Sequence, residues 1–176
     1  MIVKVKINNA IGNLYRKNHS LILVKQADKY ILGQKKHFYP NDFARMLGGA
    51  INEGETPKAA AIREIKEEIG ITITNPEFIA TLKTIANTAQ GEMIMTTHIF
   101  FYEVPFNIKL EPSDDISGLK ILTEQELQKL IFSMSQLTGT YHNEEGLFNF
   151  DWQDYGKIYE PIHQIAFDYA KNNNYC

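Results

Sequence analysis

The chain has 176 residues, of which 44% are hydrophobic and 22% charged, a size and balance that suit one globular domain and exclude a disordered chain. Its formal net charge of −3 gives no general attraction for a polyanion, so extended nucleic acid is not expected as a partner. The single cysteine, Cys176, excludes an internal disulfide, and neither a secretion signal nor a membrane-spanning apolar run is found, so we expect a cytoplasmic protein with no membrane partner.

The N-terminal part of the chain predicts three strands followed by a loop. Apolar and charged residues alternate over Met1–Ile7, which is the pattern of a half-buried strand. Apolar runs at Ser20–Gln26 and Tyr30–Gly33 predict two more strands, joined by a hairpin turn. A proline and its polar neighbours then predict a loop over Gln34–Met46, with a helical turn at Asp42–Met46.

Thr56–Ile69 is the clearest predicted helix. Thr56 is a good N-cap residue, and Pro57 suits the first helical position, where a missing N–H costs nothing. Alanines in the following turn favour the helix, and Gly70 can adopt the left-handed conformation in which helices commonly end. The residues at both ends therefore predict the limits of this helix.

The C-terminal half predicts a hairpin, a short strand and two helices. Thr123, with Glu126 three residues later, has the sequence of a capping box, so we expect a helix from Thr123 through Ile131. Ser133–Asp154 is too long for an ordinary connection, so we expect either a lid or a separately packed flap there. This order of elements predicts an α/β sheet with helices on both faces, in one domain over residues 1–176. The other expected elements are strands at Phe78–Ala86, Met93–Val104 and Leu119–Leu122 and a helix at Lys157–Lys171.

Three glutamates share one face of the helix predicted at Thr56–Ile69. Because each residue turns a helix by about 100°, Glu68 lies about 40° to one side of Glu64 and Glu67 about 60° to the other. The apolar stripe lies on the other side and is expected to face the core, so that the acids face away from it. That stripe consists of Ala61, Ile62, Ile65 and Ile69.

In most helices rich in glutamate, an acidic face of this kind is simply solvated. Here the three charges repel one another at i, i+3 and i+4 spacing. They also lie near the C-terminal end of the helix, where the helix dipole favours cations. A bound divalent cation would reverse both penalties, and Mg²⁺ prefers carboxylate oxygens and substrate phosphates as ligands. The pattern therefore favours a cation site.

The run from Gly49 to Ile71 reads GAINEGETPKAAAIREIKEEIGI. It contains every fixed position of the pattern G-x5-E-x7-R-E-U-x-E-E-x-G-U, in which U is aliphatic. This pattern is the Nudix box, and over these residues the chain resembles the Nudix hydrolase family. One departure is Leu47, because many members have proline before the two glycines. The resemblance implies an α/β/α sandwich around a mixed β-sheet, with the box as a loop, helix and loop.

The resemblance also implies the metal ligands and the catalytic acids. By that analogy Glu64, Glu67 and Glu68 bind Mg²⁺ or Mn²⁺, and the backbone carbonyl of Gly48 is a further ligand. Glu68 and Glu64 are then also the expected catalytic carboxylates. The metal would neutralise the substrate phosphates, activate a water molecule and stabilise the leaving oxygen.

Four other box residues have expected structural roles. Arg63 and Glu55 should pair and hold the helix and the preceding loop in register. Gly49 opens the box, and Gly70 should end its helix. The alternative for the pair is a plain surface ion pair, which contributes almost nothing to stability.

Residues outside the box are expected to complete the site. Asp115 precedes the strand predicted at Leu119–Leu122, where many relatives carry an acid, so it is a candidate general base or extra ligand alongside Glu68. The alternative for Asp115 is an ordinary turn. Arg45 and Lys36 are expected to bind the substrate phosphates, although a solvated loop would carry such residues without that role.

The function implied by the resemblance is metal-dependent hydrolysis of a phosphoanhydride bond in a nucleoside diphosphate linked to another group X. Residues that mark particular substrate classes are missing outside the box, so the identity of X stays open. The main alternative is a Nudix fold that only binds nucleotide, as a sensor or binding module. Such proteins usually lose box glutamates, whereas this chain keeps all of them. Many members pair as homodimers, so a homodimer is compatible with the resemblance.

Overall fold

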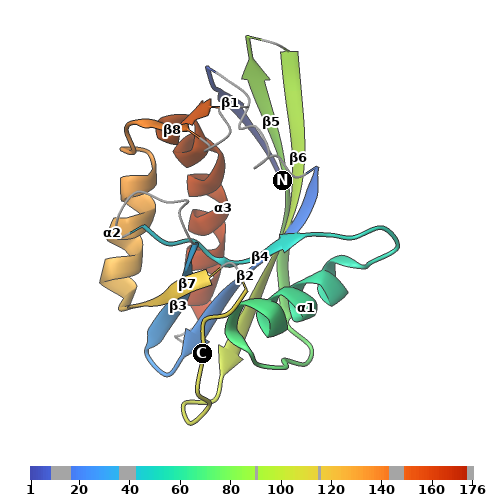
Figure 1. The fold of residues 1–176 in the computed structure, drawn as a ribbon, viewed down its shortest axis with the longest axis vertical. Helices are drawn as coiled ribbons and strands as arrows, with labels where there is room; N and C mark the ends of the chain where they lie inside the picture. The colour runs from blue at the N-terminus through green and yellow to red at the C-terminus, as the bar shows by residue number, and fades with distance from the viewer. Residues whose placement is uncertain (9–16, 36–42, 90, 115, 143–148, 174–176) are drawn as a thin grey trace.

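The computed structural model describes residues 1–8, 17–35, 43–89, 91–114, 116–142 and 149–173. A mixed sheet forms the middle layer, with α1 on one face and α2 and α3 on the other (Figure 1). This arrangement confirms the α/β/α sandwich predicted from the sequence. In chain order the elements are β1 (Ile2–Lys6), β2 (Asn18–Gln26), β3 (Lys29–Lys35), β4 (Leu47–Ala50), α1 (Pro57–Ile69), β5 (Glu77–Thr88), β6 (Gly91–Val104), β7 (Ile116–Leu122), α2 (Glu124–Met134), β8 (Thr140–His142), β9 (Asn149–Asp151) and α3 (Trp152–Asn173).

The sheet has the strand order β1-β5-β6-β2-β3-β7, with β4 as an additional partner of β2. One edge of β2 pairs in parallel with β6 along its whole length. Its other edge pairs antiparallel with β4 over His19–Ile22 and with β3 over Val24–Gln26. Because β3 and β4 follow one another along the same edge, the chain entering β4 passes close to β3. Arg45 makes two backbone hydrogen bonds with Gly33 there, of 2.9 and 3.1 Å.

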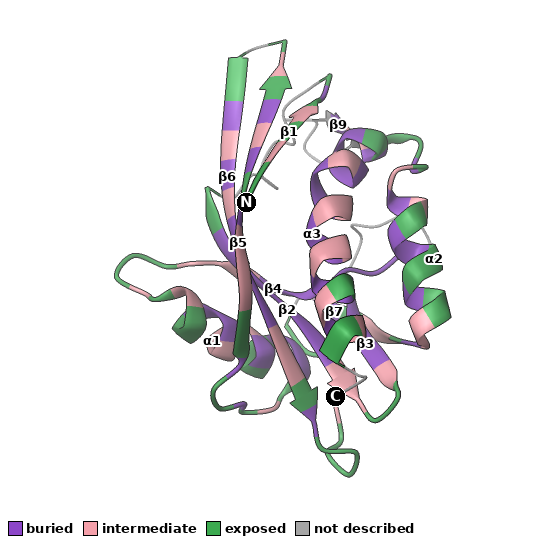
Figure 2. Cartoon of the chain, turned by 180° about the vertical axis from the view of Figure 1, so that it is seen from behind, coloured by how far each residue is buried: buried purple, intermediate pink, exposed green. Residues whose placement is uncertain are grey.

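Two hydrophobic clusters hold the layers together, one on each face of the sheet. Successive residues of β2 alternate between them: Leu21 and Leu23 pack under α2 and α3, while Ile22 and Val24 pack under α1. The buried residues of the helices face the sheet, and α2 carries exposed residues on its outer face (Figure 2). This alternation follows from the period of two in a strand that is buried on both faces.

The ends of α1 agree with the sequence prediction. The Thr56 hydroxyl accepts a hydrogen bond of 3.2 Å from the backbone N–H of Ala59, and Pro57 is the first residue of the helix. Gly70 has a φ of 74° and donates its N–H to the Lys66 carbonyl, as expected of a glycine that ends a helix. These local interactions set the two ends of the helix that carries the acids.

Two parts of the expected secondary structure are wrong. Strand β4 was not expected, because Gly48 and Gly49 have low strand propensity and the strand forms only through its pairing with β2. The helical turn expected at Asp42–Met46 is not found over the described residues 43–46, which instead contain the bridge between Arg45 and Gly33. Tertiary pairing overrides local propensity at both places.

The connection expected at Ser133–Asp154 is also shorter than predicted, and it contains a pair of short strands. Helix α2 continues to Met134, α3 already starts at Trp152, and β8 and β9 pair with each other in between. Phe150 and Trp152 are buried, with ring centroids 5.1 Å apart, so these two aromatic residues belong to the core. The idea of a lid or flap stays a prediction for the rest of this segment, which includes residues outside the described part.

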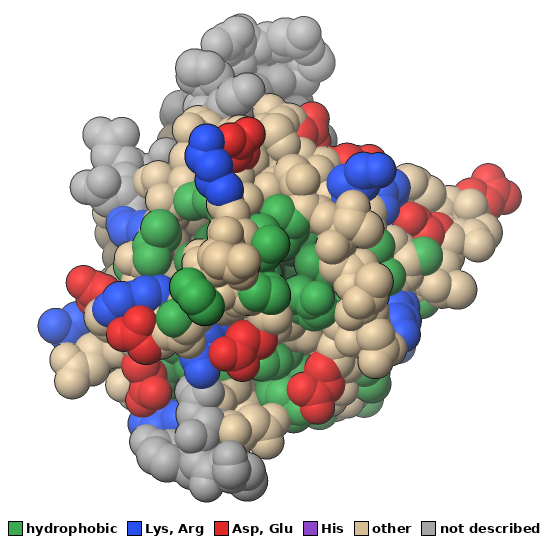
Figure 3. All heavy atoms as spheres, turned by 90° about the horizontal axis from the view of Figure 1, so that it is seen from below, with side chains coloured by type: hydrophobic (Ala, Val, Ile, Leu, Met, Phe, Trp, Pro, Cys, Tyr) green, Lys and Arg blue, Asp and Glu red, His purple; other side chains and the backbone are tan. Residues whose placement is uncertain are grey.

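Among the described residues, no helix is both long and apolar enough to cross a membrane. Seen from below, hydrophobic side chains gather in the middle of the face, with acidic and basic side chains interspersed around them (Figure 3). Outside the grey atoms, this face therefore lacks the single-signed charge that binds a nucleic-acid backbone.

Candidate active site

Strand β4 lies against the acidic side of α1 and buries one of the three acids. Glu68 is only 2% exposed, and its Oε2 accepts a hydrogen bond of 2.7 Å from the backbone N–H of Gly48. The acids were expected to face away from the core on a face open to a cation, but Glu68 is buried against β4. Helical periodicity places it correctly beside Glu64, but it cannot show that a strand packs on that side.

Both glycines of β4 are needed for this close contact. A Cβ atom at Gly48 would lie 2.2 Å from the backbone oxygen of Ser20, and the φ of Gly48 is +123°, a conformation that other residues rarely adopt. A Cβ atom at Gly49 would lie 2.5 Å from Oε1 of Glu64. The first glycine therefore lets β4 approach β2, and the second leaves room for the Glu64 carboxylate.

Replacing Gly49 with alanine is expected to displace Glu64 without unfolding the protein. The clash involves the end of a flexible side chain, which can move, so we expect a fall of about 10- to 100-fold in kcat with little change in Tm. The matched control is Gly54→Ala, because nothing lies within 4 Å of a Cβ there. Its positive φ of 76° should cost stability but not activity. Equal kcat in the two variants would contradict this account of Gly49.

Arg63 connects the box loop to the acids of α1. Its Nε and Nη2 donate to the two carboxylate oxygens of Glu55 at 2.9 and 3.0 Å, so the expected pair is present. Its Nη1 donates to Glu64 at 2.7 Å and to Glu67 at 2.9 Å. These partners raise the pKa of Arg63, and Arg63 lowers the pKa of Glu55. A single guanidinium group thus holds the loop and partly neutralises two acids.

Burial sets the electrostatics of the remaining acids. It raises the pKa of Glu68 to about 7, although the Arg45 charge, the Gly48 N–H and the Lys35 charge all act in the opposite direction. Burial also raises the pKa of Glu64, and Arg63 opposes that rise. The protein therefore holds carboxylates where their negative charge is poorly solvated. A nearby divalent cation would favour the charged form of both groups.

The donor atoms fit a hard divalent cation. Glu64, Glu67 and Glu68 each use one carboxylate oxygen in the hydrogen bonds described above and keep the other, and oxygen donors are the ones that Mg²⁺ and Mn²⁺ prefer. Among the described residues, no three acidic, histidine or cysteine side chains are already grouped around a common point. Nη1 of Arg63 instead contacts Glu64 and Glu67, while Glu68 is held separately by the Gly48 N–H.

The predicted phosphate-binding residues are only partly placed. Arg45 is 8% exposed, and its Nη2 donates to the Gly48 carbonyl at 3.2 Å, so the proposed metal-binding carbonyl already accepts one hydrogen bond. A carbonyl oxygen has a second lone pair that can still bind a cation. Lys36 lies outside the described residues. Its neighbour Lys35, at the end of β3, is close enough to lower the pKa of Glu68.

The connection from β6 to β7 caps the C-terminal end of α1. The N–H of Ser113 donates to the carbonyl of Glu68 at 2.9 Å, and the Ser113 hydroxyl donates to the carbonyl of Glu67. The N–H of Glu111 donates to the carbonyl of Ile69 at 3.3 Å. Asp115 itself lies outside the described residues, so its role stays a prediction. Sequence reasoning missed Ser113, whose only signal was a serine beside two aspartates.

A histidine of α3 was also missed by sequence reasoning. His163 is 1% exposed, its Nε2 lies 2.9 Å from the N–H of Met46, and its Nδ1 lies 2.8 Å from the carbonyl of Tyr159. Burial lowers the pKa of His163, the hydrogen bond to the Tyr159 carbonyl opposes this, and the Arg45 charge adds to the lowering, so that the pKa is about 4. A lone histidine on the buried face of an amphipathic helix gives no signal of such a role in the sequence.

This pKa predicts a pH dependence of stability. The pKa of His163 in the folded chain is lower than the value of 6.5 expected after unfolding. The stability that the neutral histidine contributes to the free energy of unfolding is therefore complete above pH 6.5 and is lost as the pH falls towards 4. The loss amounts to about 3 kcal/mol. Glu68, with its raised pKa, changes in the opposite direction, because its contribution is present below pH 4.5 and is lost as the pH rises towards about 7.

The contributions of His163 and Glu68 to stability are separated by comparing urea unfolding of the wild type and of His163→Gln at several pH values. The free energy of unfolding of the wild type, relative to that of the variant, should fall by about 3 kcal/mol between pH 7 and pH 4. The contribution of Glu68 cancels in this difference. Parallel pH profiles for the two proteins would contradict the buried, neutral state of His163.

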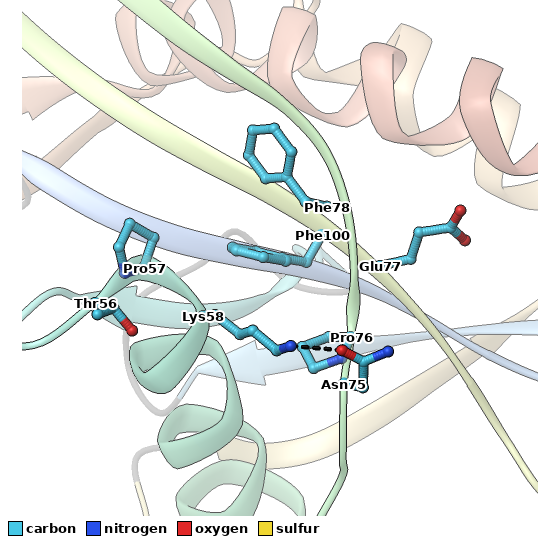
Figure 4. A pocket seen from close by; sticks show the side chains of 8 residues that line it. All are labelled: Thr56, Pro57, Lys58, Asn75, Pro76, Glu77, Phe78 and Phe100. Atoms are coloured by element: carbon cyan, nitrogen blue, oxygen red, sulfur yellow. Dashed lines mark hydrogen bonds between the residues drawn. The ribbon is translucent and has the colours of Figure 1, made fainter.

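A separate groove of about 470 Å³ lies beside the N-terminal end of α1. Phe78 and Phe100 form one wall, with ring centroids 5.6 Å apart, and Pro57 faces them from α1 (Figure 4). Lys58 donates to the side chain of Asn75 at 2.5 Å on its rim. The acids of α1 are not among the residues that line this groove. It is therefore not part of the carboxylate site.

Comparisons with known proteins match this arrangement. The NUDIX domain pattern matches residues 8–140. The chain is 35% identical over 83 residues to an oxidized purine nucleoside triphosphate hydrolase of Danio rerio, covering 46% of this chain and 51% of the relative. It is 30% identical over 61 residues to an NAD-capped RNA hydrolase, NudC, of Pseudomonas aeruginosa, covering 35% of this chain and 22% of the relative. The chain thus spans about half, or less, of the length of these relatives.

A solved structure supports the fold independently. The dihydroneopterin triphosphate pyrophosphohydrolase of E. coli superposes with a TM-score of 0.52 at 22% identity, over 66% of this chain and 85% of that protein. The part of the chain that superposes is thus much longer than the box. Because the family pattern also covers most of the chain, including every box residue gathered around α1 and β4, the chain belongs to the NUDIX domain family.

Proposed function

We propose that the protein hydrolyses a phosphoanhydride bond in a nucleoside diphosphate linked to another group, in the cytoplasm and with Mg²⁺ or Mn²⁺ as its cofactor. The observation that carries this proposal is the contact between β4 and α1. It keeps the Glu68 carboxylate buried and hydrogen-bonded to Gly48, beside Glu64 and Glu67. An acidic site of this kind binds an anionic substrate only with the help of cations.

In this proposal the chain supplies the ligands of the cation and a general base for the attacking water. Glu64, Glu67, Glu68 and the Gly48 carbonyl would hold the cation, which supplies charge to the phosphates and acidity to a water molecule. Glu68 is one proposed base, because its carboxylate is held beside the other acids and can accept a proton from the water. Asp115 is the other proposed base. The attacking water loses its proton to this base as its oxygen bonds to phosphorus and the anhydride oxygen leaves.

The cations near the site suit a phosphorylated substrate. Arg45 and Lys35 both act on Glu68 electrostatically, and Lys36 follows Lys35 in the chain. We propose that they help to bind the phosphates of a small nucleotide. The relatives named above act on oxidized purine nucleoside triphosphates and on NAD-capped RNA, which supports a nucleotide substrate without choosing between these classes.

The test is a substrate panel run with Mg²⁺, with Mn²⁺ and with EDTA, with products separated by chromatography. The panel holds oxidized and ordinary nucleoside triphosphates, ADP-ribose, nucleotide sugars, dinucleoside polyphosphates and NAD-capped RNA. We expect at least one compound to be cleaved at an anhydride bond, and EDTA to stop the reaction. A folded protein that binds a nucleotide but cleaves nothing on the panel would refute the proposal in favour of a binding module.

A further inference from the structure

The surroundings of His163 define its protonation and its ring orientation. A backbone carbonyl can only accept a hydrogen bond, so Nδ1, 2.8 Å from the Tyr159 carbonyl, carries the hydrogen. A backbone N–H can only donate, so Nε2, 2.9 Å from Met46, is the acceptor. Both ring nitrogens of a fully buried side chain are therefore used, in one tautomer of the neutral ring.

Met46 connects this histidine to the carboxylate site. It is the residue before β4, it is buried, and its N–H points to α3, on the opposite face of the sheet from α1. Two residues later, Gly48 donates its N–H to Glu68 and accepts a hydrogen bond from Arg45 through its carbonyl. The short segment from Arg45 to Gly48 is thus held by α3 at one end and by α1 at the other.

We propose that His163 is a positioning residue that sets the place of Gly48, and through it the place of Glu68, from the far side of the sheet. This inference rests on the proposed function only for its effect on catalysis. Without an acceptor at Nε2, the buried N–H of Met46 would have no partner in this position, and the segment would shift to find one. If the residues just before β4 are displaced, the Gly48 N–H that donates to Glu68 is displaced with them.

Two substitutions separate the roles of the two ring nitrogens. The side-chain amide of glutamine reaches the place of Nε2, so His163→Gln can still accept from Met46, whereas the shorter His163→Asn reaches only the place of Nδ1. We expect His163→Asn to lower both kcat and the affinity for Mn²⁺ by about 10- to 100-fold with little change in KM, and His163→Gln to recover most of this loss. The control Gln164→Ala, on an exposed part of the same helix, should behave like the wild type.

The decisive readouts do not depend on turnover. Mn²⁺ affinity is measured by electron paramagnetic resonance, and the hydrogen exchange of the Gly48 amide by NMR. The exchange should become faster in His163→Asn and stay slow in His163→Gln. Wild-type Mn²⁺ affinity and slow Gly48 exchange in a folded His163→Asn would overturn the inference. A wild type that cleaves no substrate would instead refute the proposed function, and the Gly48 exchange would still decide the role of His163.

The wild type provides a second test in case His163→Asn does not fold. The ¹⁵N resonances of the Met46 amide and of His163 Nε2 are followed during a titration with Mg²⁺. Both should shift with the same midpoint as the Gly48 amide if the segment moves as one unit. A shift of Gly48 at saturating Mg²⁺, with Met46 and His163 unmoved, would overturn the inference.

Discussion

Replacing Glu68 with glutamine is expected to lower kcat by about 10³-fold while the protein stays folded. Glutamine has the same shape, and its oxygen can still accept the hydrogen bond from Gly48, so only the negative charge is lost. Because burial raises the pKa of Glu68 to about 7, removing the charge should not destabilise the fold and can stabilise it above pH 7. The measurements are steady-state kinetics and Tm.

Two control variants show whether this effect belongs to the buried acid alone. Glu67 is half exposed and has Arg63 as its partner, so Glu67→Gln should reduce kcat less, by roughly 10-fold. Glu53 is exposed in the box loop, so Glu53→Gln should leave kcat unchanged. If Glu68→Gln retained a kcat close to that of the wild type, the proposed part of Glu68 in catalysis would be wrong.

Replacing Gly156 with alanine is expected to destabilise the protein by about 3 kcal/mol, a fall in Tm of roughly 6–12 °C. A Cβ atom at this position in α3 would lie 1.8 Å from the carbonyl oxygen of Met134, at the end of α2. Backbone atoms cannot turn aside as a side chain can, so the two helices would have to separate. Helix propensity alone predicts the opposite sign, because alanine favours a helix over glycine by about 1 kcal/mol.

Unfolding can be followed through the single tryptophan, Trp152, which is buried in the first turn of α3. The matched control is Gly139→Ala, because nothing lies within 4 Å of a Cβ there. Its φ of +92° still makes alanine unfavourable, so a smaller cost of about 1 kcal/mol is expected. A Gly156→Ala protein as stable as the wild type would show that α2 and α3 do not approach as closely as described.

Local signals predicted α1 well, because every determinant of that helix lies within it or next to it. Thr56, Pro57 and Gly70 act on their own neighbours, and both ends of the helix were predicted to the residue. The spacing of Glu64 and Glu68 likewise follows from helix geometry alone. The capping box at Thr123 is a second case, and both of its hydrogen bonds are present.

The features that the sequence did not predict all depend on partners that are distant in the chain. Strand β4 exists through its pairing with β2, and the burial of Glu68 depends on Gly48, twenty residues earlier. His163 acts on Met46, which is 117 residues away in the chain. Periodicity and propensity describe a segment in isolation, so they cannot identify which strand covers a helix or which backbone N–H a buried histidine accepts from.

The central claim is that α1 and β4 form a site for a divalent cation, and direct binding of Mn²⁺ tests it most simply. The affinity of the wild type and of Glu68→Gln is measured by electron paramagnetic resonance near pH 8, above the raised pKa of Glu68. The account predicts saturable binding to the wild type and an affinity at least about 10-fold lower for the variant. A folded wild type that binds no Mn²⁺, or a variant that binds it equally well, would contradict the account.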